Sequence, residues 1–375
     1  MSKERSDNLV LFLSGRESNY PRNQMIIAAL QNSYHTEVIS SQRDDISRGS
    51  FYCIILQSIK CSIKALKGLI FSKYKFIFVG FFGQFILLFI SSFTKVPMVF
   101  DFFVSAYDTL VFDRKLFKSN SIIAKLLYKL DFFCCNKAEL ILVDTKTQGN
   151  YFSDIFFIPK EKIKVLFVGC DEDLFHPIEI NEDPDLVLYY STYMPLHGVE
   201  IVIQAAKILE NTSSIKFKLI GEGMGLQSAL ELANNLNTSN ILFSPSIPLM
   251  LLPDEIAKAT ICLGGHFGNT AKAKRVIPGK IYQILAMRKA AIVGDTKANR
   301  ELLTHGIDAW FCNLSDPNSL ADGIKILHEN QELRKQISEA GYQTFKSKAS
   351  FKTLGITFES TIINQLFPRD NIQRK

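Results

Sequence analysis

The sequence predicts an α/β protein made of two doubly wound, Rossmann-like domains, each with a parallel sheet covered by helices. Strand-like and helix-like segments alternate along the whole chain, which is typical of parallel sheets. Several of the predicted strands are apolar at nearly every position, as expected of strands that are buried on both faces. The chain has 375 residues, too many for one compact core and suitable for two domains.

In the first half of the chain, strands are expected at 10–15, 35–40, 76–80, 97–103, 140–144 and 163–169, with helices over 22–32 and 84–93. The apolar run 76–93 is also a candidate transmembrane segment by its length and composition. Gly80, Gly83 and Gln84 interrupt this run where a buried strand would turn into a buried helix. We therefore interpret it as a strand followed by a helix.

In the second half, strands are expected at 186–191, 217–221, 240–244, 261–265, 290–294 and 309–313, with helices over 198–210, 225–236, 278–288 and 317–328. The polar, proline-containing stretch 176–185 interrupts the pattern and is the predicted linker. The expected domains are therefore 1–177 and 178–350. A helix within 351–375 is expected to pack back on the first domain.

Composition excludes several classes of protein. With 47% hydrophobic and 21% charged residues, the chain is neither disordered nor collagenous. Its seven cysteines form no CxxC pair, which predicts reduced thiols in a cytoplasmic protein. The polar amino terminus shows no secretory signal pattern. A net charge of +6 is too small to indicate a partner by itself.

The distribution of charge is more informative. No acidic residue occurs between Asp45 and Asp101, whereas seven lysines and arginines do. Within this stretch, helical spacing relates an apolar row to a neighbouring basic row, Ile59, Ile63, Leu66 and Ile70 beside Lys60, Lys64 and Lys67. This predicts a basic amphipathic helix over 59–75. Its basic row is either an ordinary solvated face or a peripheral contact with an anionic membrane surface.

Ligands of open α/β sheets bind at the carboxyl ends of the strands, so we examined the loops that follow strands. The loop 191–200 enters a helix. The loop 221–225 has glycine at Gly221, Gly223 and Gly225, which either allows close approach to a ligand or simply forms a tight turn.

The loop 264–283 is basic and opens a helix near Pro278. Helix amino termini attract anions, so the cation Lys280 in the first turn opposes the helix dipole. A bound phosphate would explain its presence, together with the preceding Lys272, Lys274 and Arg275. The alternative is a solvated basic loop.

Four segments of the second half resemble, in order and spacing, the retaining glycosyltransferases of family 4, which have the two-domain GT-B fold. They are the strand followed by PLHGVE and later KLIGEG, then IPGKIYQILAMRKAAIVG, GDTKANRELL and DPNSLADGI. The resemblance covers most of 160–345. It implies two Rossmann-like domains facing a central cleft, a nucleotide-sugar donor bound mainly by the second domain, and an acceptor facing the first.

The chain departs from the family pattern at several positions, among them Arg288 and Ala290, where a glycine and a proline are common. Thr192 and His197 stand where family members carry arginine and lysine for the donor diphosphate, and Arg275 and Gln283 replace a pair of glutamates. Either the site is degenerate, or the positive charge has moved to the loop that holds Lys272, Lys274, Arg275 and Lys280. We favour relocation of the charge.

These considerations define the expected site. The catalytic candidates are Asp101 and Lys280. The donor-binding candidates are Thr192, His197, Gly221, Gly223, Lys272, Lys274, Arg275 and Gln283. The acceptor-side candidates are Arg16, Arg22 and Asn23. No metal ligands are predicted, because no DxD-like pair is apparent in a loop after a strand apart from Asp171–Glu172–Asp173, which the resemblance assigns to inter-domain packing.

The resemblance implies metal-independent hexosyl transfer with retention and no cofactor beyond the nucleotide-sugar co-substrate. A saccharide or lipid-linked acceptor is expected, in polysaccharide or lipid-linked glycan biosynthesis at the inner face of the cell membrane. A catalytically silent GT-B paralogue that serves as a scaffold subunit is the alternative. An epimerase or glycosidase is less favoured, because no carboxylate pair stands out. The sequence lacks the pattern of a nucleic-acid-binding protein.

Overall fold

The computed structural model describes residues 8–15, 18, 20–40, 51–211, 214–363 and 366. The chain divides into two compact units, one formed by Met1–Phe167 with Lys352–Lys375 and the other by Val168–Phe351. Residues 168–177 therefore belong to the second unit. The boundary predicted from the sequence had assigned them to the first domain. The reason is local bonding, because the Cys170 thiol donates to the Tyr282 carbonyl and Glu172 bonds to Lys346 and to the Phe351 amide.

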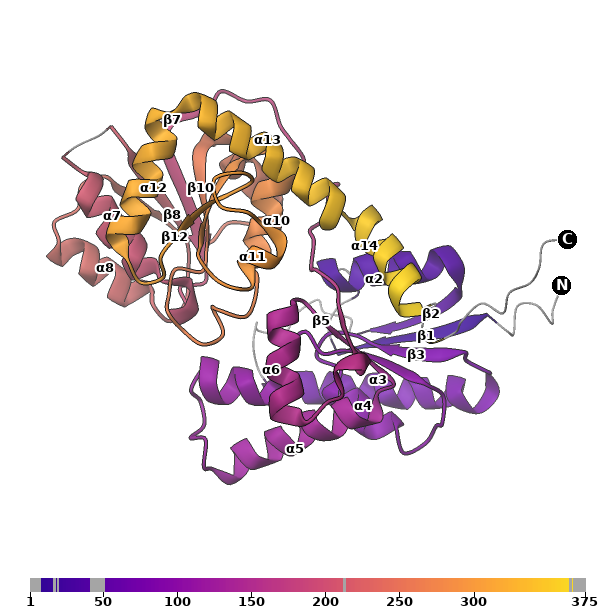
Figure 1. Ribbon diagram of the computed structural model, residues 1–375. Coiled ribbons are helices and arrows are strands. Elements are labelled where there is room, and N and C mark those ends of the chain that lie inside the picture. The colour runs from indigo at the N-terminus through magenta and orange to yellow at the C-terminus, as the bar shows by residue number, and fades with distance from the viewer. Residues whose placement is uncertain are drawn as a thin grey trace, which may run out of the picture. The chain divides into compact units, whose positions relative to one another are not determined.

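The first unit contains a six-stranded parallel sheet of order β2-β1-β3-β4-β5-β6 (Figure 1). Its strands are β1 (Leu9–Ser14), β2 (His35–Ser40), β3 (Phe76–Val79), β4 (Met98–Asp101), β5 (Leu140–Val143) and β6 (Ile163–Val165). Its helices are α2 (Pro21–Ser33), α3 (Phe51–Phe71), α4 (Gln84–Ile90), α5 (Ile122–Lys137), α6 (Lys146–Phe156) and α14 (Phe351–Thr357), with short turns η1 (Asp108–Asp113), η2 (Lys160–Lys162) and η5 (Phe358–Ile363). All six strands expected from the sequence are confirmed.

The apolar run 76–93 is divided between β3 and α4, as the glycines predicted. β3 is buried at every position, because it lies inside the sheet between β1 and β4. Among the described residues, no helix is long and apolar enough to span a bilayer.

Two packed layers of helices flank the first sheet. α3 contacts α4, α4 contacts α5, and α5 contacts α6, while α2 packs with η5 near the carboxyl end of the chain. Figure 1 shows α2 and α14 on one side of this sheet and α3, α4 and α5 on the other. α14 and η5 therefore belong to the same layer as α2.

The second unit contains a six-stranded parallel sheet of order β12-β11-β10-β7-β8-β9. Its strands are β7 (Asp183–Ser191), β8 (Lys216–Gly221), β9 (Ile241–Ser244), β10 (Ala259–Gly265), β11 (Ala290–Gly294) and β12 (Trp310–Cys312). Its helices are α7 (Val199–Leu209), α8 (Leu226–Asn235), α9 (Leu252–Lys258), α10 (Gly279–Ala286), α11 (Asn299–Leu302), α12 (Pro317–Glu329) and α13 (Gln331–Lys348), with short turns η3 (Pro195–His197) and η4 (Leu249–Leu251). The expected strands and helices are again confirmed.

The strand order of the second sheet determines where its ligand site lies. The chain winds outward from β7 through β8 to β9, and then returns to the other side of β7 as β10. Adjacent parallel strands whose connections leave in opposite directions form a crevice at their carboxyl ends. The second unit therefore has its switch point between β7 and β10.

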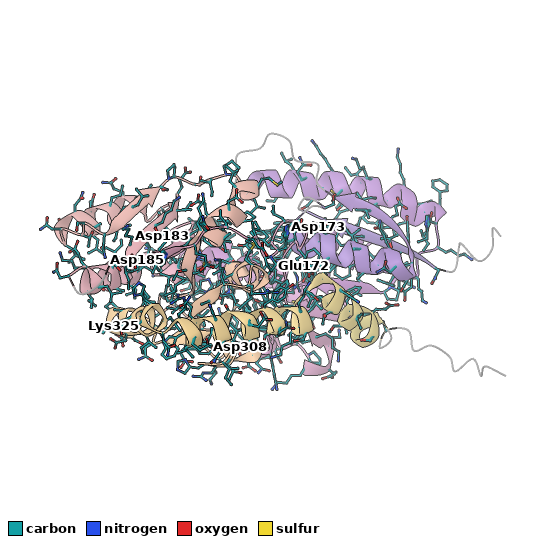
Figure 2. All side chains as sticks on the ribbon, turned by 90° about the horizontal axis from the view of Figure 1, so that it is seen from above. Glu172, Asp173, Asp183, Asp185, Asp308 and Lys325 are labelled. Carbon is teal, nitrogen blue, oxygen red and sulfur yellow. The ribbon has the colours of Figure 1, made fainter. Side chains whose placement is uncertain are left out.

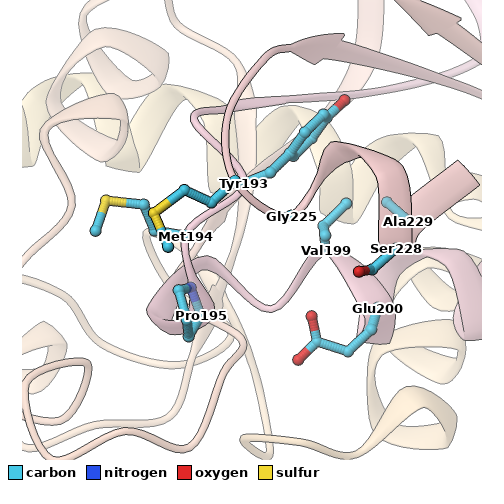
Figure 3. Close-up of a pocket in the computed structure, with 9 residues that line it drawn as sticks. Tyr193, Met194, Pro195, Val199, Glu200, Gly225, Ser228 and Ala229 are labelled. Carbon is cyan, nitrogen blue, oxygen red and sulfur yellow. The ribbon is translucent and has the colours of Figure 1, made fainter. Parts of the chain in front are cut away.

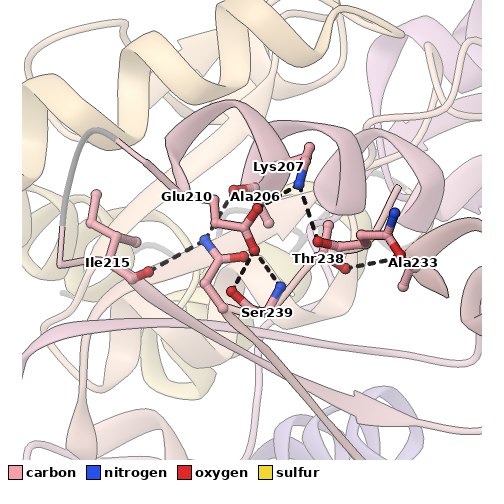
Figure 4. Close-up of polar contacts among 9 residues, drawn as sticks. Ala206, Lys207, Glu210, Ile215, Ala233, Thr238 and Ser239 are labelled. Carbon is pink, nitrogen blue, oxygen red and sulfur yellow. Dashed lines mark hydrogen bonds and ion pairs between the residues drawn. The ribbon is translucent and has the colours of Figure 1, made fainter. Parts of the chain in front are cut away.

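Polar contacts join α7 to the segment before β9 at the amino ends of the strands of this sheet. Lys207 and Glu210 at the end of α7 pair at 2.6 Å, and the Ser239 hydroxyl donates to Glu210 (Figure 4). The Lys207 and Ser239 contacts lower the pKa of Glu210 to about 2. This network ties α7 to the segment before β9 and belongs to the scaffold.

The described cysteines agree with the expected reduced state. Cys61, Cys134, Cys135, Cys170, Cys262 and Cys312 are free and buried. Burial raises the pKa of each of these thiols, most strongly for Cys134 and Cys135. They behave as small apolar side chains of the core.

Candidate active site

Two loops meet at the switch point of the second sheet. The loop after β7 runs through η3 into α7, and the loop after β10 runs from His266 to α10. The amides of Phe267 and Gly268 donate to the carbonyls of His197 and Leu196, at 3.3 and 3.2 Å. Gly198, with φ of +65°, has no space for a side chain because the Phe267–Gly268 backbone lies against it. The two loops therefore form one surface.

Lys280 lies in the first turn of α10 and turns its ammonium into this surface. Nζ is buried, with no hydrogen-bond or ion-pair partner among the described residues. It lies 4.4 Å from the centroid of the Tyr189 ring and 5.6 Å from that of Tyr190. A Cβ added at Gly265 would lie 3.8 Å from it, which places the ammonium at the carboxyl end of β10.

This environment holds a cation without neutralising it. Aromatic faces attract an ammonium through their quadrupole but carry no net charge. Burial lowers the pKa of Lys280 to about 7, because the charged form loses its hydration. An anion placed here would restore the charge on Lys280.

Two histidines lie beside Lys280. The rings of His197 and His266 stack with centroids 5.5 Å apart and planes 11° apart. Burial, with the charges of Lys280 and Lys272, lowers the pKa of His197 to about 3 and that of His266 well below its usual value. Both rings are therefore neutral at pH 7.

Hydrogen bonding indicates the tautomer of His197. Its Nδ1 accepts from the Met194 amide at 3.4 Å, so the ring proton lies on Nε2. Neutral His197 can thus donate one hydrogen bond without adding charge. His266 was not among the expected residues; its signal was its position directly after Gly264–Gly265 at the end of a strand.

The basic residues of the β10–α10 loop differ in exposure. Lys274 is exposed, Lys272 is half-buried, and Arg275 is buried, at 8% exposed. The Arg275 amide donates to the Lys272 carbonyl at 2.9 Å, which closes a turn. Lys272 is close enough to influence both histidines, so Lys272 and Lys280 make this pocket basic.

Gln283 lies one turn after Lys280. Its Oε1 accepts from the Tyr190 hydroxyl at 2.9 Å, and that hydroxyl also lies 3.4 Å from the Lys280 carbonyl. The bond orients the Gln283 amide and leaves its NH₂ group as the donor toward a ligand. Tyr190 was not expected from the sequence, where it reads only as a strand residue.

The glycines of the loop 221–225 have a structural reason. Gly221 and Gly223 have φ of +150° and +139°, and a Cβ at either would overlap the carbonyl oxygen of Ser191 or Thr192. The close approach therefore involves the backbone after β7, which the sequence could not distinguish from approach to a ligand. Thr192 itself is exposed.

A cavity of about 310 Å³ opens beside these loops, between the starts of α7 and α8. Tyr193, Met194, Pro195, Val199, Glu200, Met224, Gly225, Ser228 and Ala229 line it (Figure 3). Its walls are largely apolar. Since Met194 bonds to His197, the cavity adjoins the histidine side of the site.

In the first unit, the structure corrects the role expected for Asp101. Its carboxylate is fully buried and forms a two-pronged ion pair with Arg22, with Nε–Oδ2 and Nη2–Oδ1 distances of 2.8 Å. Arg22 Nη1 also donates to the Leu166 and Phe167 carbonyls, at 2.8 and 3.2 Å. Asp101 and Arg22 therefore join β4, α2 and the end of the first unit, and neither is placed to orient an acceptor.

The other acceptor-side candidates also lack support as ligand-binding groups. Asn23 is buried, and its Nδ2 donates to the Ser14 hydroxyl at 3.0 Å. Arg16 lies outside the described residues. In the DxD-like triplet, Glu172, labelled with Asp173 in Figure 2, accepts from Lys346 at 2.9 Å and from the Phe351 amide at 2.7 Å. The described residues contain no group of three or more potential His, Cys, Asp or Glu metal ligands.

Comparison with known proteins relates the chain to glycosyltransferases. Residues 171–344 match the family described as Glycosyl transferases group 1. The chain has the GT-B fold. Sucrose-phosphate synthase from Thermosynechococcus elongatus superposes with a TM-score of 0.71 at 12% identity, over 97% of this chain and 100% of that one. HepE from Anabaena, solved with UDP and glucose, superposes with a TM-score of 0.68 at 16% identity, over 95% and 100%.

One curated relative, an uncharacterized glycosyltransferase from Methanocaldococcus jannaschii, is 25% identical over 249 residues. The match covers 63% of this chain and 62% of the relative. These findings confirm the expected resemblance to GT-B glycosyltransferases. They also place the matched family segment over the unit that holds Lys280, His197 and His266.

Proposed function

We propose that the protein is a hexosyltransferase that moves a sugar from a nucleoside diphosphate donor to a hydroxyl acceptor with retention. The observation that carries the proposal is Lys280, a buried ammonium with no anionic partner among the described residues, at the switch point of the second sheet. An isolated buried charge is costly, and the diphosphate of a donor would compensate it.

The other groups of the pocket suit the same ligand. Lys272 adds positive charge, and neutral His197 adds an Nε2–H donor. Gln283, oriented by Tyr190, is placed one helical turn along α10, where its NH₂ group would donate to a ribose hydroxyl. This arrangement supports relocation of the diphosphate site from the β7 loop to the β10–α10 loop.

In the proposed reaction, the bond between the anomeric carbon and the diphosphate oxygen breaks as the acceptor oxygen bonds to that carbon on the same face. The acceptor proton passes to a donor phosphate oxygen. Negative charge builds on the leaving diphosphate, so fixed cations and N–H donors stabilise the transition state. Lys280 and Lys272 supply the positive charge for which other enzymes use a divalent cation, and we propose a metal-independent reaction.

The acceptor is proposed to be a saccharide or a lipid-linked compound used in cell-surface polysaccharide or lipid-linked glycan synthesis. We propose a cytoplasmic protein that associates peripherally with the membrane. The exposed Lys60, Lys64 and Lys67 of the basic helix α3 support the membrane contact. No role with nucleic acid is proposed.

Calorimetric titration with UDP, GDP, ADP and CMP, each with and without Mg²⁺, tests the proposal. UDP is the first probe because HepE was solved with it. We expect one nucleotide to bind, and we expect Mg²⁺ to leave its affinity unchanged. The Lys280→Met variant should bind that nucleotide more weakly. Lys335→Met removes an exposed lysine of α13 and is the matched control.

If no nucleotide binds at about 1 mM, the binding free energy is weaker than about −4 kcal/mol. That result would overturn the proposed donor site and favour a catalytically silent scaffold. Binding that requires Mg²⁺ would overturn the metal-independent mechanism. A product that retains the anomeric configuration of the donor, read by NMR of the transferred sugar, would support retention.

A further inference from the structure

α3 exposes several of its larger apolar side chains and buries small ones, unlike the usual surface helix. Its buried row consists of small residues, Ser58, Cys61, Ser62 and Ala65. Several larger apolar residues face outward, with Ile63 at 53%, Ile70 at 73% and Phe71 at 87% exposed, although Leu69 packs against the core. A surface helix normally buries its apolar stripe against the core, so this outward row needs another explanation.

α5 shows the same feature by different means. Its inner side buries Ala124, Leu127, Cys134 and Cys135. Its outer side is also apolar, with Ile122 at 77%, Leu126 at 59% and Phe132 at 38% exposed. A surface helix normally keeps its larger apolar side chains on the buried side, yet these three face solvent on the outer side of α5, beside the exposed Lys125 and Lys129.

α3 and α5 belong to one layer. α4 contacts both of them, and Figure 1 shows the three helices on the same side of the first sheet. The exposed Leu88 of α4, Phe93 just after it, and Phe112 and Leu116 before α5 add to the apolar surface. We call the outer surface of α3, α4 and α5, with residues 112–118, the basic-apolar face.

Cations accompany the apolar residues on this face. The exposed ones are Lys60, Lys64, Lys67, Arg114, Lys115, Lys118, Lys125 and Lys129, and the exposed Lys73 and Lys95 lie just beyond the ends of α3 and α4. Acidic residues are few in these segments: Asp131 of α5 is buried and accepts hydrogen bonds from Ser105, Tyr107 and Gln84, and Asp113 is half-buried. Exposed apolar side chains among lysines and arginines are complementary to an anionic lipid surface, with its phosphates above an acyl layer.

We propose that the basic-apolar face docks on an anionic bilayer, with its apolar side chains at the boundary of headgroups and acyl chains and its lysines and arginines on lipid phosphates. This inference rests on the membrane association proposed above and extends it from α3 to α5 and residues 112–118. It does not depend on glycosyl transfer.

Flotation of the full chain with phosphatidylglycerol–phosphatidylcholine vesicles, compared with pure phosphatidylcholine vesicles, tests the proposal. We expect binding to the anionic vesicles that falls as salt rises. Because each lysine contributes roughly 1 kcal/mol at an anionic surface, the double variant Lys125→Gln/Lys129→Gln should bind about 30-fold more weakly. The control Lys335→Gln/Lys352→Gln removes two exposed lysines from α13 and α14 and should change binding less than about twofold.

The apolar contribution has its own variant, Ile122→Ser/Leu126→Ser, which should weaken vesicle binding by about tenfold or more. Both side chains are exposed, so the unfolding transition should be unchanged and UDP titration should match the unaltered chain. That second readout separates failure of the membrane face from failure of the donor site.

Three results would overturn the inference. One is equal binding to anionic and neutral vesicles, or none. Another is loss of binding in Lys60→Gln/Lys64→Gln but not in the α5 variants, which would confine the contact to α3. The third is self-association in sedimentation that the α5 substitutions abolish, which would assign the face to a second copy of the chain.

Discussion

Replacing Lys280 by methionine should strengthen the fold and weaken nucleotide binding in one step. Methionine keeps the length and apolar character of the side chain and removes the ammonium from its position over Tyr189 and Tyr190. The unliganded protein then no longer carries a buried cation without an anionic partner. The nucleotide loses the group that we propose holds its diphosphate.

The change in stability can be sized from the pKa. A decrease from 10.5 to about 7 corresponds, at 1.36 kcal/mol per unit, to about 5 kcal/mol against the charged form. Part of this gain is offset by loss of the cation–π contacts. We expect the free energy of unfolding of Lys280→Met to exceed that of the unaltered chain by about 2–4 kcal/mol below pH 7.

The sign of the pH dependence follows from the same shift. Between pH 7 and 10.5 the unfolded state binds more protons at this lysine than the folded state does. The stability of the unaltered protein should therefore rise with pH across this window. The methionine variant should lack this rise, so the two curves converge at alkaline pH.

Binding should show the opposite sign. Removing a hydrogen bond to a charged group costs about 1.5–3 kcal/mol, or roughly 10- to 150-fold in Kd. A bound diphosphate favours protonated Lys280, so binding takes up a proton above pH 7 and Kd should rise by up to about tenfold per pH unit. The nucleotide is already ionised there, because its phosphate has a pKa of about 6. His197, with a pKa of about 3, does not titrate in this window.

Chemical denaturation and UDP calorimetry between pH 6 and 9 measure both effects on the same preparations, with Lys335→Met as control. The reasoning is refuted if Lys280→Met binds UDP as tightly as the unaltered protein, with the same pH slope. It is also refuted if the variant is less stable at pH 7, since Lys280 would then have an anionic partner in the free protein.

Gln283→Glu should bind UDP several-fold more tightly, because hydrogen bonds from a ribose to a charged acceptor are about twice as strong; unchanged calorimetric affinity would count against a ribose contact. Asp101→Leu should lower the free energy of unfolding in urea by about 3–5 kcal/mol by leaving the Arg22 guanidinium buried without its partner. The double variant Arg22→Met/Asp101→Leu should lose clearly less, and equal losses would contradict the buried-pair account. Gly223→Ala should lower the free energy of unfolding by about 2 kcal/mol or more, because the φ of Gly223 and the nearby Thr192 carbonyl both exclude a side chain. Gly279→Ala, where nothing lies within 4 Å, is its control, and a loss of the same size there would undo the comparison.

The fold was predictable because the signal is repeated. Each parallel strand must be apolar enough for burial on both faces, and each helix must follow a strand, so a dozen short patterns agree with one another. The run 76–93 illustrates this agreement, since Gly83 separates β3 from α4 in the sequence and in the structure. The second unit was clearer than the first because its loops also resemble a family.

The site was predictable only in part. Lys280 was singled out in the sequence because a cation at a helix amino terminus is unfavourable without an anion, and its role in donor binding stays a prediction. Asp101 was misassigned because an acid at a strand end has the same appearance in sequence whether it faces a ligand or an arginine 79 residues away. His266 and Tyr190 were missed for a related reason. Their roles arise from contacts with His197 and Gln283, which local spacing does not contain.

Sequence alone determined the alternation of strands and helices, the two parallel sheets, the basic loop before α10 and the acid-free stretch around α3. These depend on residue type and on neighbours a few positions apart. The tertiary structure decided which face of α3 meets the sheet, which partner satisfies Asp101 and which aromatic rings surround Lys280. In α3 the small residues Ser58, Cys61 and Ala65 are buried, whereas Ile63 and Ile70 are exposed. Helical periodicity marks two faces of a helix, but close packing of the neighbouring elements decides which one is buried.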